Sequence, residues 1–98
     1  MPYRLFEDER VKRKARELYV RERAQYEDIR RVLRADPYPS SGTTRIRRLE
    51  FDDGLTIFSY AVPSSRYTVV YTVREADPGE ELGVVRVVAL IDRGSERG

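Results

Sequence analysis

The sequence predicts an α+β fold, in which an N-terminal helical pair packs on one face of an antiparallel meander sheet of about four strands. Residues 7–36 contain neither glycine nor proline, and their apolar residues recur at the spacing of a helix. Beyond the turn-forming segment DPYPSSG (36–42), apolar residues alternate with polar ones, as in a half-buried strand. Asp53-Gly54 lies between two alternating runs and favours a two-residue hairpin turn.

The helical region divides into two helices, over residues 7–20 and 23–35. Apolar residues at helical spacing form one stripe at Val11, Ala15, Leu18 and Tyr19, and a second at Tyr26, Ile29 and Leu33. Glu22 stands where a continuous stripe would need its next apolar member, so we expect a turn near Arg21 to Arg23. One long helix stays open as an alternative, because no glycine or proline marks the turn. Asp36-Pro37 ends the second helix, since proline disfavours the α conformation in the residue before it.

Four strands are predicted after the helices, and a short one before them. They are Ile46–Phe51, Leu55–Val62, Tyr67–Val73 and Val84–Asp92, preceded by the run Tyr3–Phe6. The third carries Tyr67 and Tyr71 on one face together with valines, and the last is apolar on both faces, so both are expected to be central and buried. The whole chain, residues 1–98, is expected to be one domain, because two would each lack a core.

Composition excludes several kinds of chemistry. The chain has no cysteine and no histidine, which removes disulfides, thiolate metal sites and the commonest general base. The acidic pairs Asp52-Asp53 and Glu80-Glu81 are adjacent residues beside turns, and adjacent strand residues point to opposite faces. We therefore predict no metal site and no cofactor, so any chemistry would come from other polar side chains or from a bound RNA.

The charge is uneven along the chain. Residues 1–35 hold eleven Lys or Arg against seven Asp or Glu, within a net charge of +2 for the whole sequence. This basic half fits nucleic acid or an acidic partner segment, and it fits a solvated helix surface equally well. No leader-like segment and no apolar run long enough to span a bilayer is present, so we expect a cytoplasmic protein without a membrane partner.

Three segments resemble a known group of proteins. VLRADPYP (32–39) ends the helical half, RYTVVYTV (66–73) forms the third alternating run, and VVRVVALIDR (84–93) closes the sheet. In this order they resemble the RelE/ParE toxin superfamily. The resemblance implies a toxin of a type II toxin–antitoxin system, bound and neutralised by a cognate antitoxin. RelE-like members cleave mRNA at the ribosome, and ParE-like members inhibit DNA gyrase.

The resemblance can be followed residue by residue. RelE-like members place an RNA-facing arginine on the central strand, where this chain has Thr68. Their basic residues on the preceding strand match Ser59 and Ala61, neither of which carries charge. Only the arginine that closes the last strand is matched, by Arg93. The fold is thus implied, and the RelE catalytic set is not.

Other arginines could supply the missing charge. RNA cleavage by the 2′-hydroxyl needs the charge on phosphorus stabilised, which a guanidinium can do through charge-assisted hydrogen bonds. We predict Arg66 and Arg93 as catalytic residues, and as nucleic-acid-binding residues Arg45, Arg47, Arg48 and Tyr60. Tyr38 and Tyr60 are expected to be exposed, whereas Tyr67 and Tyr71 are expected in the core. The alternative is that these arginines belong to an ordinary charged strand surface, where their aliphatic stems cover the edge of the sheet.

Three functions follow as hypotheses. The first is a toxin that acts as a metal-independent endoribonuclease on ribosome-bound mRNA through an atypical arginine site. The second is a non-enzymatic toxin that binds a protein target such as DNA gyrase, which the missing histidine and the missing central arginine favour. The third is an unrelated small binding module with the same architecture. We take the toxin as the main hypothesis.

Overall fold

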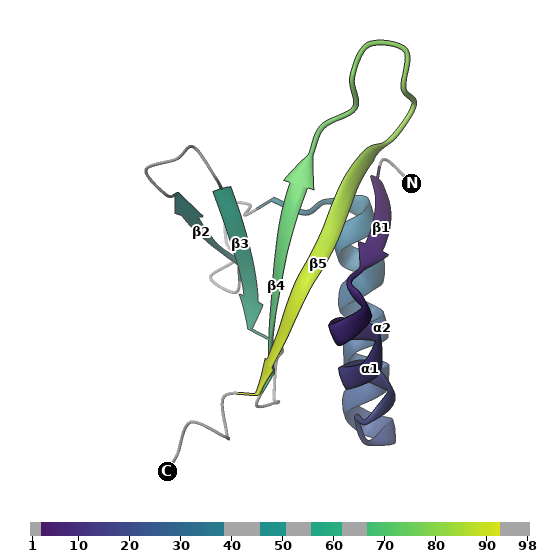
Figure 1. Cartoon of the computed structure of the whole chain (residues 1–98), viewed down its shortest axis with the longest axis vertical. Coiled ribbons are helices and arrows are strands. Elements are labelled where there is room, and N and C mark those ends of the chain that lie inside the picture. Colours follow the sequence, from purple (N-terminus) through teal and green to yellow (C-terminus); the bar gives the residue numbers. More distant parts are fainter. Residues whose placement is uncertain (1–2, 39–45, 51–55, 62–66, 93–98) are drawn as a thin grey trace.

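A computed structural model describes residues 3–38, 46–50, 56–61 and 67–92, and it confirms the α+β class. Two helices pack beside a five-stranded sheet, toward its β1–β5 side, and β2 lies at the opposite edge (Figure 1). The elements are β1 (Tyr3–Glu7), α1 (Glu9–Arg16), α2 (Val20–Ala35), β2 (Ile46–Glu50), β3 (Thr56–Ala61), β4 (Tyr67–Arg74) and β5 (Gly83–Asp92).

The sheet has the strand order β1-β5-β4-β3-β2. Strands β2 to β5 pair with their chain neighbours in antiparallel fashion, which confirms the predicted meander. The short first strand also exists, and β1 pairs with β5 in parallel, so the sheet is mixed. β4 therefore occupies the centre and β5 lies between two partners, as the alternating and apolar patterns indicated. The Asp53-Gly54 turn lies outside the described residues.

The helical region is two helices, but the turn between them comes earlier than predicted. α1 ends at Arg16 and α2 begins at Val20, so the predicted turn near Arg21 to Arg23 was wrong. Leu18 belongs to the turn and is buried there, at 6% exposure, and Tyr19 has an extended backbone with φ −64° and ψ 159°. The two apolar stripes are therefore separated at the turn around the buried Leu18, and not at Glu22.

The core lies between the helices and one face of the sheet. Tyr67, Val69 and Tyr71 on β4 point into it, which confirms the prediction that both tyrosines are core residues. The helices supply Val11, Tyr26, Ile29 and Leu33, and the turn between them supplies Leu18. The Tyr71 hydroxyl donates a hydrogen bond of 2.6 Å to the Pro37 carbonyl, so this buried polar group has a partner just beyond the end of α2.

A row of aromatic rings joins the end of α2 to the sheet. Tyr3 meets Tyr38 edge to face, Tyr38 meets Phe58 in the same way, and Phe58 stacks on Tyr71 at 5.5 Å between ring centroids. The hydroxyls of Tyr3 and Tyr38 both donate to the carboxylate of Glu75. Tyr38 is 36% exposed, as predicted. These contacts fix β1 and the segment after α2 against the central strands.

Candidate nucleic-acid interface

One face of the sheet is left uncovered by the helices, and we call it the open face. Because strand residues alternate between faces, the registers assign to it Arg4, Phe6, Arg47, Leu49, Ile57, Ser59, Ala61, Thr68, Val70, Thr72, Arg74, Val84, Arg86, Ala89 and Ile91. A nucleic acid that binds the sheet on this face would contact these side chains, so their charge determines whether the face can hold phosphates.

The centre of the open face carries no charged side chain. Thr68 pairs with Ala61 on one side and with Ile91 on the other, and Ser59 pairs with Val70. The three positions that match the basic residues of RelE-like members, Ser59, Ala61 and Thr68, therefore lie together here. The hydroxyls of Ser59 and Thr68 can hydrogen-bond to a ligand, but none of the three side chains can neutralise a phosphate. The cluster of basic side chains that the resemblance would imply is thus missing from the centre of the described face.

The predicted nucleic-acid-binding residues on β2 point in opposite directions. Arg47 lies opposite Ser59 on the open face, whereas Arg48 lies opposite Phe58 and therefore on the other face. Arg48 is also paired with Glu50, at 2.7 Å between Nη2 and Oε1. The two arginines cannot serve one ligand on a single face of the sheet.

Tyr60 was expected to be exposed, and that expectation was wrong. Its ring is only 9% exposed and belongs to the core, on the face covered by the helices. It pairs with the buried Ile46, and it shares its side of β3 with Phe58. Arg45, Arg66 and Arg93 lie outside the described residues, so Arg47 is the predicted site residue that the described part of the open face retains.

Positive charge on the open face gathers at the β1–β5 end instead. A hollow with a volume of about 620 Å³ opens there, between β1, the start of β5 and the connection from β4. Its lining consists of Arg4, Phe6, Arg74, Gly79, Glu80, Glu81, Leu82, Val84 and Arg86. Arg86 lies in the middle of the last predicted strand, and the sequence alone did not place it beside Arg4. The alternation in YRLF puts Arg4 and Phe6 on the same face of β1, and the parallel pairing of β1 with β5 places that face beside Arg86.

One arginine of this hollow is already paired. Arg74 Nη1 lies 3.0 Å from Glu80 Oε1 and 3.4 Å from Asp77 Oδ2. The Asp77 backbone N–H also donates to Glu80, at 3.1 Å. The hydrogen bond from Arg74, followed by the one from Asp77, lowers the pKa of Glu80 to about 2, so this carboxylate stays charged. Gly79 supports the tight turn with a φ of 93°, which glycine adopts readily.

The other two arginines of the hollow are available to a ligand. Arg4 and Arg86 are exposed, and neither has an ion-pair partner among the residues that the structure describes. Phe6 is the register partner of Arg86, lies two residues from Arg4 along β1, and is 49% exposed. Two unpaired guanidinium groups beside an exposed aromatic ring can bind an anion that carries a planar group.

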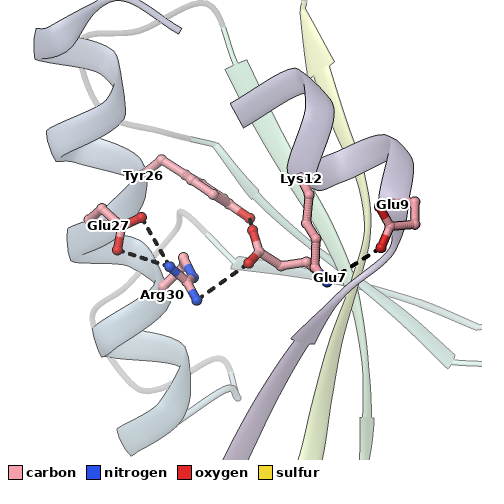
Figure 2. A network of polar contacts seen from close by, with 6 residues as sticks. All are labelled: Glu7, Glu9, Lys12, Tyr26, Glu27 and Arg30. Carbon is pink, nitrogen blue, oxygen red and sulfur yellow. Dashed lines mark hydrogen bonds and ion pairs between the residues drawn. The ribbon is translucent and has the colours of Figure 1, made fainter. Parts of the chain in front are cut away.

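A second polar cluster lies on the helical side and has a structural role (Figure 2). The Tyr26 hydroxyl donates to Glu7 Oε2 at 2.6 Å, and Arg30 pairs with Glu7 at 3.3 Å and with Glu27 at 3.0 Å. Burial, with the bond to Glu7 second, raises the pKa of Tyr26 far above its ordinary value. The hydroxyl therefore remains a protonated donor that joins α2 to the end of β1, and it is unsuited to acid–base catalysis near neutral pH.

Comparison with known proteins identifies structures of similar fold. The sequence matches no protein-family model and no curated protein. The structure is similar to the archaeal RelE–RelB complex from Pyrococcus horikoshii OT3, with a TM-score of 0.73, 21% identity and 100% of both chains covered. The chain has the RelE fold.

A bacterial structure of the same fold is also similar. The intact E. coli RelBE toxin–antitoxin complex matches with a TM-score of 0.55 and 23% identity, over 90% of this chain and 93% of that one. The fold implied by the three sequence segments is thus confirmed. The described ranges hold no helix that combines the length and the apolarity needed to cross a bilayer.

Proposed function

We propose that this chain is the toxin of a toxin–antitoxin pair, acting in the cytoplasm and neutralised by a cognate antitoxin protein. The observation that carries the proposal is the RelE fold over the full chain, shared with a protein solved in complex with RelB. Exposed apolar side chains on the open face, Phe6, Leu49 and Ile91, support it as well, because a binding partner could cover them.

The target that we propose is mRNA on the ribosome, cleaved without a metal. In such a reaction the 2′-oxygen bonds to phosphorus while the P–O5′ bond breaks, and the 2′-hydroxyl proton leaves as the 5′-oxygen gains one. The arginines would stabilise the charge that develops on the phosphate. We assign that role to Arg66 and Arg93, with Arg47 holding the RNA on the open face, where it lies opposite Ser59.

The second candidate is a toxin that acts by binding a protein such as DNA gyrase. The uncharged centre of the open face favours it, because Ser59, Ala61 and Thr68 offer neither charge nor useful acidity where RelE-like members have basic residues. An apolar, neutral surface of this kind suits a protein partner better than it suits a phosphate.

The two candidates are separated by three assays on the intact chain. Induced expression should arrest growth, and co-expression of a short neighbouring reading frame should restore it. The purified chain should then cleave ribosome-bound mRNA, and Arg66→Ala with Arg93→Ala should abolish cleavage. Inhibition of gyrase supercoiling without cleavage would select the second candidate. A chain that does neither and leaves growth unaffected would refute both.

A further inference from the structure

We propose that the hollow at the β1–β5 end of the open face binds the backbone of single-stranded RNA. Arg4 and Arg86 hold phosphates in this arrangement, and Phe6 is the surface on which a base stacks. The inference rests on the proposed action on mRNA and adds to it a binding position made of residues other than those assigned to cleavage.

The strand register brings the three side chains together. Phe6 is the register partner of Arg86, and Arg4 that of Val84, so the two arginines lie on neighbouring strands and two residues apart along them. With strand spacings of about 4.8 Å and a rise of about 3.3 Å per residue, their Cα atoms are separated by about 8 Å. All three side chains line the same hollow, with Phe6 next to Arg86.

The charges in the hollow favour an anion. Arg74 and Glu80 neutralise each other through their ion pair. Of the remaining lining residues, Arg4 and Arg86 are positive and Glu81 is negative, and none of these three has an ion-pair partner within the described part of the chain. The planar fork of each guanidinium can donate two parallel hydrogen bonds to one phosphate.

The exposed ring favours nucleic acid over an acidic peptide. Phe6 is 49% exposed, it lies outside the buried core, and it has no ring partner among the described aromatic residues. Bases of single-stranded RNA stack on such free aromatic faces whatever their sequence, while arginines follow the backbone. The hollow offers both kinds of contact within two neighbouring strands.

The test measures binding of a fluorescein-labelled, mixed-sequence single-stranded RNA to the full chain across a series of salt concentrations. Each phosphate contact contributes about 0.7 to the slope of log affinity against log salt for single strands. The double variant Arg4→Ala/Arg86→Ala should therefore reduce the slope by about 1.4. The matched control is Arg10→Ala/Arg13→Ala on α1, which also removes two exposed arginines but on the helical side, and it should leave the slope unchanged.

Further variants separate charge from stacking. Phe6→Leu should weaken binding by about five-fold or more without changing the slope, because it removes stacking and no charge. Arg4→Lys/Arg86→Lys should keep the slope but bind less tightly, since lysine lacks the planar fork. Glu81→Gln should tighten binding by removing a nearby negative charge. Circular dichroism of every variant checks that the fold is kept.

The outcomes also separate this inference from the proposed function. If the intact chain binds RNA and the Arg4/Arg86 variant keeps its full slope, the hollow is not the site, while action on RNA stands. An equal loss of slope in the α1 control would likewise overturn the inference. If the intact chain cleaves ribosome-bound mRNA but binds no free RNA at any salt concentration, the RNA site is refuted and the proposed function stands.

Discussion

Gly83, the first residue of β5, occupies a position with no room for a side chain. A Cβ added there would lie 2.7 Å from the carbonyl oxygen of Arg74 and 2.8 Å from the ring of Tyr3. The carbonyl belongs to the backbone of the paired strand, and the ring is held by hydrogen bonds from its hydroxyl to Glu75. Gly83→Ala must therefore shift β1 or β4 relative to β5.

The expected cost of this substitution is that of overpacking a tight site, about 1–3 kcal/mol in the free energy of unfolding. For a domain of this size, each kcal/mol lowers Tm by about 4–8 °C. Thermal unfolding followed by circular dichroism measures the change. The double variant with Tyr3→Ala should recover part of the loss, because it removes the ring but leaves the backbone oxygen in place.

Gly79→Ala is the matched control for this experiment. No atom lies within 4 Å of a Cβ added at Gly79, and the cost there comes from its positive φ alone, about 1–2 kcal/mol. Tyr3→Ala should therefore give no recovery in the Gly79→Ala background. A Gly83→Ala variant that melts with the unchanged protein would refute the close packing of Tyr3 and Arg74 around β5.

Three further predictions concern the polar contacts of Tyr26, Tyr71 and Glu80. Tyr26→Phe should lower the free energy of unfolding by about 1.5–3 kcal/mol in urea unfolding, because it removes a hydrogen bond to a carboxylate. Tyr71→Phe should cost about 1–3 kcal/mol in the same assay, since it leaves the Pro37 carbonyl without its donor; unchanged midpoints would contradict either contact. The pKa of Glu80 is lowered to about 2, so its ion pair stabilises the fold fully at pH values above the ordinary carboxyl pKa. This stabilisation is lost as the pH falls from about 4.5 toward 2. The difference in Tm between Glu80→Gln and the unchanged chain should therefore be present at pH 7 and vanish near pH 2, and a difference that does not change with pH would refute it.

Much of the fold could be predicted from periodicity. The change from helical spacing to alternation separates the two halves, and the repeated pattern of Tyr67 to Val73 identifies the central strand. The helix turn was misplaced because no breaker residue marks it, and its real anchor, Leu18, looks like one more member of an apolar stripe. The position of such a turn depends on packing against the sheet, and the spacing of apolar residues in the sequence does not reveal that packing.

The candidate site was less predictable, because it depends on which strands are neighbours. The parallel pairing of β1 with β5 joins residues 80 positions apart, and a short run such as YRLF does not specify its partner. Without that pairing, Arg4 and Phe6 cannot be placed beside Arg86. The exposure of Tyr60 was misjudged although Phe58, two residues earlier, points to the same side of β3, opposite the small residues Ser59 and Ala61.

The most direct measurement of the proposed function is growth of a culture after induction of this chain, alone and together with the short reading frame beside its gene. We predict that the chain alone arrests growth and that the neighbouring product binds it and restores growth. Growth that continues unchanged while the folded chain accumulates would contradict the proposal that this RelE fold is a toxin.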